Sequence, residues 1–329
     1  GITMMKRNAI IHIVAVFLLP ILLAACTDEI GVITAGEETV DGTMKVSLTV
    51  AMPDYVRETR AEGSINRMDL LCFDDKGIFI GKGTDIKVTP SDAVHGSLTG
   101  YVPNNTCRIH FIANSDVISY SAVNEWIGRN ENSLVGSLTN KTGSVSYWGY
   151  VSKNTIEEMK TFLQNGKVYL VRDCAKITIG HVAEGYEVKG IAVCNTWNSS
   201  AIAPFQYDSD APFHYYKKDG EIASVDIGNV TIPIGATKKV NPADVVAPVP
   251  AETLLYEQQN ALTDPVKVIL KIQHNGSEAY YLIYLMNDNN QQYAIIRNHE
   301  YRININSLSD ASGYHTFEEA LVGRPANNA

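Results

Sequence analysis

The side chains able to perform acid–base or nucleophilic chemistry do not fall into catalytic spacings in this sequence. Seven of the eight histidines follow the apolar N-terminus, and no two of them stand four residues apart. The HExxH pattern, Cys/His zinc spacing and the GxSxG elbow are absent from the sequence. Asp74 and Asp75 precede Gly77. This arrangement can bind Ca²⁺, but it is more typical of a hairpin turn. We therefore expect no enzyme, no cofactor and no metal site. A paired-carboxylate glycosidase stays open, because the separation of two carboxylates is a property of the fold.

Cys26 ends an apolar leader, and the chemistry expected there is lipidation. Lys6 and Arg7 precede an uncharged apolar run that ends in Leu-Ala-Ala directly before Cys26. A basic start, an apolar stretch and small residues before a cleavage point are typical of a secretory signal. The run is short for a membrane-spanning helix, and its ending resembles a bacterial lipobox. We predict a lipoprotein signal peptide over residues 1–26 with a palmitate-type anchor on Cys26, followed by a tether over 27–44.

Four further cysteines lie in strand-like runs. Export would permit disulfides among them, with three pairings if all four take part. Free thiols that act as small buried apolar side chains are the alternative. The four are Cys72, Cys107, Cys174 and Cys194.

Two arginines follow a regular strand near the N-terminus, and the chemistry expected there is proteolysis. The strand, predicted over 45–52, places four apolar side chains on one face: Val46, Leu48, Val50 and Met52. Pro53 ends it, and Thr59, Glu62 and Gly63 surround the Arg60–Ala61 bond. We predict cleavage after Arg60, with Arg57 as the alternative. Two solvated loop arginines would be the plain structural interpretation.

The elements that position these residues are strands. Period-two alternation recurs at 107–113, 267–273 and 301–306, while the apolar run 280–286 predicts a central strand. Helical signals are few: one follows Asn154, and Thr316 with Glu319 forms a capping-box pattern. We predict a mainly β protein with two β-sandwich domains, over 45–166 and 167–329, and a few short helices.

Charge and aromatic residues narrow the partners. The chain has 329 residues and a net charge of −9, with its 27 basic residues scattered. A nucleic-acid site requires clustered basic residues, so we expect none. Trp148, Tyr150 and Tyr216 lie in aromatic clusters that could contact a glycan or a host protein. Aromatic residues of this kind are also ordinary core and rim residues of a sandwich.

Several segments, taken in order, resemble the Bacteroidales fimbrillin (type V pilin) superfamily. They span nearly the whole chain after the leader: the opening VSLTVAMP…TRAEGSINRMDLLCFDDKGIFIG, then CRIHFIANS, SYWGYV, VYLVRDCAKITI, LLYEQQN and IIRNHEYRININSL. The resemblance implies two tandem transthyretin-like β-sandwiches in a subunit of a surface fimbrium (pilus) that supports cell adhesion.

The resemblance also implies an assembly route. Such lipoproteins are exported to the outer membrane and cut by an arginine-specific surface protease, here after Arg60. The cut removes the first strand, and a segment of another fimbrial subunit replaces it by donor-strand exchange. The side chains of Val46, Leu48, Val50 and Met52 would then fill the groove before cleavage. A permanently anchored lipoprotein that binds glycans or host proteins through aromatic loops is the alternative function.

Three points stay open in the sequence. The role as stalk, anchor or tip subunit is not decided, and neither is the receptor. The ending RPANNA resembles the interior of longer members of the superfamily, so whether the C-terminal domain is truncated also stays open.

Overall fold

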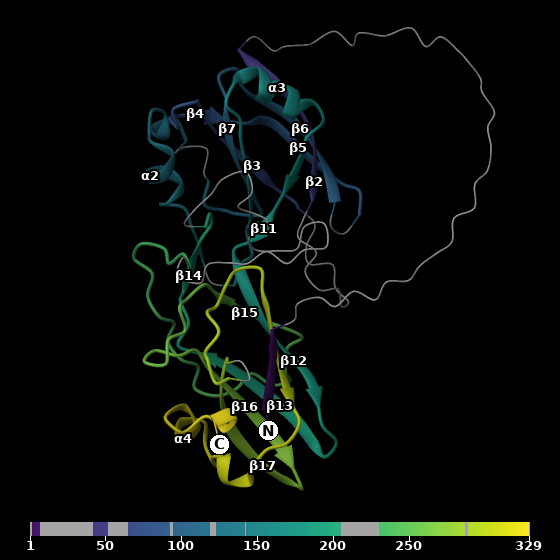
Figure 1. Cartoon of the computed structure of the whole chain (residues 1–329), viewed down its shortest axis with the longest axis vertical. Helices are drawn as coiled ribbons and strands as arrows, with labels where there is room; N and C mark the ends of the chain where they lie inside the picture. The colour runs from purple at the N-terminus through teal and green to yellow at the C-terminus, as the bar shows by residue number, and fades with distance from the viewer. Residues whose placement is uncertain are drawn as a thin grey trace, which may run out of the picture.

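The computed structural model describes residues 2–6, 42–51, 65–92, 95–118, 123–141, 143–204, 230–286 and 289–328. The described chain is mainly β with several sheets and a few short helices, which confirms the predicted fold class. Figure 1 shows the strands in two groups, one above the other.

The first group consists of two sheets. A four-stranded sheet has the order β10 (Lys167–Tyr169), β2 (Thr43–Ala51), β6 (His95–Pro103), β5 (Thr84–Pro90). A five-stranded sheet has the order β11 (Val171–Arg172), β9 (Tyr147–Ser152), β7 (Arg108–Ala113), β3 (Met68–Phe73), β4 (Phe79–Lys82).

The second group also consists of two sheets. A four-stranded sheet has the order β1 (Ile2–Lys6), β18 (Glu300–Ile305), β12 (Cys174–Val182), β15 (Thr253–Tyr256). A three-stranded sheet has the order β13 (Tyr186–Cys194), β16 (Lys267–His274), β17 (Ser277–Tyr284). Between the groups lies a two-stranded ribbon of β8 (Thr139–Lys141) and β14 (Ser199–Ala201), with β14 visible at mid-height in Figure 1.

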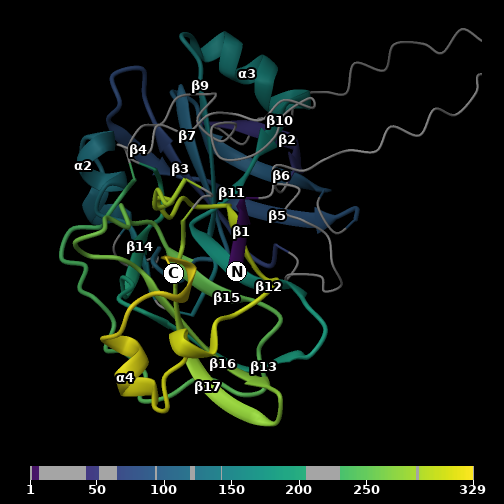
Figure 2. The same ribbon diagram turned by 60° about the horizontal axis from the view of Figure 1, so that its bottom comes forward.

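The helices are short and cover the outside of the sheets. The α-helices are α2 (Glu131–Val135), α3 (Ile156–Asn165) and α4 (Phe317–Leu321), and the 3-10 turns are η1 (Asn124–Trp126), η4 (Asp310–Ser312) and η5 (Ala326–Asn328). Figure 2 shows α2 and α3 on different sides of the first group. None of the helices in the described ranges is long and apolar enough to cross a membrane.

Local sequence signals account for the starts of two helices and for one turn. Thr316 and Glu319 form the predicted capping box at the start of α4. The cap of α3 is Thr155, whose side chain accepts from the backbone N–H of Glu158, so the predicted Asn154 cap is wrong by one residue. Asp74 Oδ1 accepts from the backbone N–H groups of Lys76 and Ile78, which makes this stretch a turn. No group of three metal-ligating side chains occurs among the residues described.

The change from one group of strands to the other falls at Asp173 and not at the predicted Gly166. β10 pairs with β2, and β11 pairs with β9, so residues 167–172 complete the sheets of the first group. β12, which begins at Cys174, is the first strand after them in the second group. The sequence placed the boundary at the end of the helix because the helix end is a local signal, whereas strand pairing is not.

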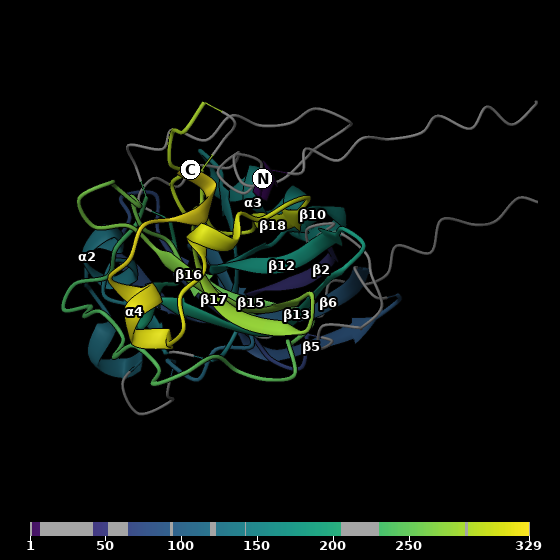
Figure 3. The same ribbon diagram turned by 90° about the horizontal axis from the view of Figure 1, so that it is seen from below.

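The prediction that residues 280–286 form a central strand is wrong. β17 lies at the end of its three-stranded sheet. Its second apolar face is covered by α4, because Phe317 and Ala320 pack with Leu282 and Ile269 in one buried cluster. Figure 3 shows α4 beside the ends of β16 and β17. A covering helix therefore explains the two-sided apolar pattern.

Cys72, Cys107, Cys174 and Cys194 are buried free thiols, which decides between the two alternatives for them. Burial raises the pKa of Cys72 to about 12 and the pKa of Cys194 to about 11. A thiol at such a pKa is mostly protonated at neutral pH and therefore a poor nucleophile. These residues act as small apolar side chains in the core.

Candidate functional site: a strand held in a groove

β2 is an interior strand of its sheet, paired along both edges. Against β6 it is antiparallel over its whole length, from Thr43 opposite Pro103 to Ala51 opposite His95. Against β10 it is parallel over three residues, with Val50 opposite Val168. Two further backbone bonds extend the second pairing: Thr49 N–H to Gly166 O at 2.9 Å and Leu170 N–H to Ala51 O at 2.8 Å.

The side chains of β2 alternate between the interior and the surface, as predicted from the sequence. Val46 and Val50 are 0% exposed and Leu48 is 3% exposed, while the intervening Lys45, Ser47 and Thr49 are exposed. Met44 is buried as well, at 4%. The prediction missed it by starting the strand at residue 45, although the same alternation extends one step further back. Met52 lies outside the described residues.

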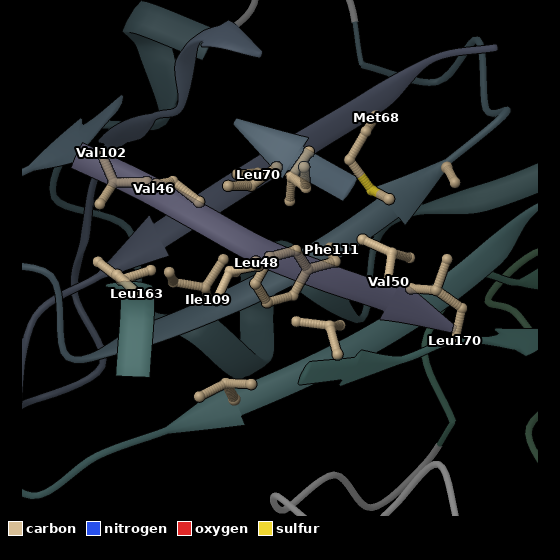
Figure 4. Close-up of a cluster of buried hydrophobic side chains, with 14 of the residues drawn as sticks. Val46, Leu48, Val50, Met68, Leu70, Val102, Ile109, Phe111, Leu163 and Leu170 are labelled. Carbon is tan, nitrogen blue, oxygen red and sulfur yellow. The ribbon is translucent and has the colours of Figure 1, made fainter. Parts of the chain in front are cut away.

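The buried face of β2 packs against the five-stranded sheet. Figure 4 shows the side chains of Val46, Leu48 and Val50 among Leu70, Ile109 and Phe111. Met159 and Leu163 of α3 belong to the same cluster. The strand therefore fills a groove. The neighbouring strands β6 and β10 form its walls, and the five-stranded sheet of the first group forms its floor.

The apolar contribution of β2 to stability is large. Each fully buried aliphatic side chain contributes roughly 1.5–3 kcal/mol, so Met44, Val46, Leu48 and Val50 together contribute about 6–12 kcal/mol. A typical domain has a net stability of about 5–15 kcal/mol. Loss of β2 without a replacement would therefore leave the first group of strands with little or no net stability.

Trp148 and Tyr150, two of the three candidate ligand-binding aromatics, are not surface residues. Both lie in strand β9, with exposed fractions of 0% and 6%. The indole Nε1–H of Trp148 donates to His110 Nδ1 at 3.0 Å, and His110 Nε2 lies 2.9 Å from Glu131 Oε1. The ligand-binding interpretation of Trp148 and Tyr150 is therefore wrong, because their rings pack in the interior.

The groups around His110 have defined charge states. Burial lowers the pKa of His110 and outweighs the opposing effect of Glu131. Burial alone would raise the pKa of Glu131, but hydrogen bonds from His110 and Arg108 outweigh it and lower that pKa. Arg108 Nη1 donates to Glu131 Oε2 at 2.7 Å. The arrangement is a neutral histidine beside an ionised Glu131–Arg108 pair, and it holds β7, β9 and α2 together.

The remaining predicted site residues lie outside the described ranges. These are the lipidation residue Cys26, the cleavage residues Arg57, Arg60 and Ala61, and the aromatic Tyr216. Of the predicted signal segment, the structure describes residues 2–6 as β1, which pairs antiparallel with β18.

Comparison with known proteins finds fimbrial tip subunits among the curated relatives of this chain. The major fimbrium tip subunit FimE of Porphyromonas gingivalis is 28% identical over 292 residues, which cover 81% of this chain and 47% of FimE. The chain is homologous to FimE. It spans about half the length of the curated relatives it matches. No family model matches the chain.

One solved structure supports the fold. A candidate cell adhesion protein from Parabacteroides distasonis has a TM-score of 0.50 at 13% identity, covering 79% of this chain and 87% of that chain. The tip fimbrial protein Mfa3 of Porphyromonas gingivalis has a TM-score of 0.46 at 15% identity, covering 81% and 96%. The curated relatives of this chain are fimbrial tip subunits by name, and no enzyme is among them.

Proposed function

We propose that this protein is a subunit of a cell-surface fimbria and that it assembles by strand exchange, with β2 as the strand that is replaced. The homology to FimE, a fimbrial tip subunit by name, supports a role in such an appendage. Its partners are then other fimbrial subunits. Main-chain hydrogen bonds to β6 and β10 would supply the affinity for an incoming strand, and the pockets filled by alternate side chains would supply the register.

The observation that carries this proposal is the place of β2 in the sheet and in the sequence. β2 contributes a full row of buried side chains, yet both Arg57 and Arg60 stand between it and β3. A cut after Arg60 would break the covalent link between β2 and the strands that enclose it. The strand would then be held by non-covalent contacts alone and could be exchanged.

The export route belongs to the same proposal. The basic and apolar leader ending at Cys26 favours a lipoprotein that reaches the outer membrane, carries its anchor there and loses it when an arginine-specific protease cuts. The mature chain would begin at Ala61. The alternative, an anchored lipoprotein that binds glycans or host proteins, loses support because Trp148 and Tyr150 are buried.

The test uses the full chain expressed in a Bacteroidales host that has a surface arginine-specific protease. Protein recovered from the cells is expected to start at Ala61 and to form ladders that resist SDS. The double variant Arg57→Ala/Arg60→Ala should keep Cys26 as its first residue and form no ladder. Arg324→Ala is the matched control, because this arginine is exposed and far along the chain from β2. Ladders of normal length from the double variant would contradict the proposal.

A further inference from the structure

One wall of the groove depends on the strand that the proposed exchange removes. Among the described residues, β10 is the end strand of its sheet, and β2 is its neighbour there. Val168 and Leu170 also pack in the same buried cluster as Val46 and Val50. Removal of β2 would therefore take both hydrogen-bond partners and packing partners away from β10. A wall that moved at this stage would not hold an incoming strand in register.

The chain directly after β10 is anchored to elements other than β2. In β11, Val171 lies opposite Trp148 and Arg172 opposite Tyr147 of β9. The Asp173 N–H extends this pairing by donating to Ser146 O at 3.0 Å. β9 also approaches β10 closely at Gly149, since a Cβ there would lie 2.7 Å from the carbonyl oxygen of Tyr169.

Asp173 is the strongest of these anchors. It is 0% exposed, and its carboxylate accepts three hydrogen bonds. Oδ1 accepts from the Ser146 N–H at 3.1 Å, and Oδ2 accepts from Asn140 Nδ2 at 2.8 Å and Ser200 Oγ at 2.6 Å. Asn140 and Ser200 lie opposite each other in the β8–β14 ribbon. One carboxylate thus ties the end of the β10–β11 segment to both strands of a ribbon that the exchange does not touch.

We infer that Asp173 is a positioning residue for strand exchange, because its hydrogen bonds to Ser146, Asn140 and Ser200 keep β10 in place while β2 is absent. This inference rests on the proposed function. The ligand of the open groove is an extended peptide with apolar side chains at alternate positions, as in residues 43–51. Asp173 does not touch that peptide and acts through β10.

The experiment measures peptide uptake by the cut protein. The purified chain is cut with an arginine-specific protease and mixed with a fluorescent peptide of residues 43–52, and the affinity is read from anisotropy. Asp173→Asn replaces one acceptor oxygen by a donor, and Ser200→Ala removes a single hydrogen bond to the same carboxylate. Asn260→Gly is the matched control, because Asn260 is buried and bonded to Val266 N and Tyr293 O in the second group. Its φ of 55° suits glycine. Thermal unfolding of each uncut variant is recorded alongside.

The expected result is a loss of peptide affinity of about tenfold in Asp173→Asn, because the amide group would leave at least one of the buried donors without its acceptor. Ser200→Ala should lose less peptide affinity. Asn260→Gly should keep its affinity within about twofold of the unsubstituted protein at a comparable fall in Tm.

Unchanged affinity in Asp173→Asn, or an equal loss in Asn260→Gly, would overturn the inference and leave strand exchange intact. If Asp173→Asn does not fold, normal affinity in Ser200→Ala overturns the inference and reduced affinity supports it. If the unsubstituted cut protein takes up no peptide, strand exchange itself fails, and the inference fails with it.

Discussion

Trp148 donates its indole N–H to Nδ1 of His110 over 3.0 Å inside the first group of strands. Nδ1 therefore accepts, and the proton of the neutral ring lies on Nε2, facing Glu131 Oε1. A second proton on the ring would have to displace the Trp148 hydrogen bond. The groups that face His110 are Glu131, Arg108, Tyr150 and Phe73, besides Trp148.

This relationship predicts a loss of stability in mild acid. The folded-state pKa of His110 lies below its unfolded value of about 6.5. The unfolded chain therefore binds more protons once the pH falls below about 6.5, and the free energy of unfolding falls with it, by up to about 1.4 kcal/mol per pH unit. Denaturant unfolding at pH 7.5 and pH 5.5 measures the effect. His110→Gln should flatten the dependence. An equal slope in the two proteins would contradict the assignment.

Leu48 offers a direct test of how much β2 stabilises the uncut protein. Leu48→Ala removes a buried side chain that packs against the five-stranded sheet of the first group. The free energy of unfolding should fall by about 2–5 kcal/mol, the usual cost of a large-to-small core substitution. Ser47→Ala, one residue away on the exposed face, should change it by less than about 0.5 kcal/mol. Similar values for the two variants would show that β2 is not packed as described.

Arg297 and Glu257 form a fully buried ion pair between the two groups of strands. Arg297 Nη2 lies 2.8 Å from Glu257 Oε2, and Nη1 donates to Ile202 O at 2.7 Å. Arg297→Met leaves Glu257 buried without its cation, so a loss of about 3–5 kcal/mol is expected in denaturant unfolding.

The matched comparison is the exposed pair Lys160–Glu157 at 3.0 Å. Lys160→Met should cost at most about 1 kcal/mol, because solvent screens a surface pair. The double variant Arg297→Met/Glu257→Met should recover part of the loss, since no unpaired charge then remains. A small effect of Arg297→Met would argue against the buried pair.

The buried cysteines should resist thiol reagents in the native state. With pKa values of about 12 for Cys72 and about 11 for Cys194, little thiolate forms at pH 8, and burial blocks access. Mass spectrometry after iodoacetamide treatment should find these two thiols unmodified in native protein and modified after denaturation. Rapid native labelling of Cys72 would mean that β3 opens easily.

Several features of this protein are determined by the sequence alone because their causes are local. The period-two alternation of Val46, Leu48 and Val50 decides which face of β2 is buried, since successive side chains of a strand point to opposite sides. Thr316 and Glu319 form a capping box because both partners lie within one helical turn. The mainly β character follows from the repetition of such patterns along the chain.

Other features are decided by the tertiary structure. A helix 33 residues beyond Tyr284 covers the strand 280–286 that the sequence marked as central. The sequence leaves open whether Trp148 and Tyr150 contact a ligand or belong to the core, and β7 and α2 supply the partners that bury them. No local sequence pattern marks Asp173 as a structural residue. Its partners Asn140 and Ser200 come from two distant segments. An alternating pattern decides which face of a strand is apolar, whereas the partner on that face depends on long-range pairing, which no short stretch of sequence encodes.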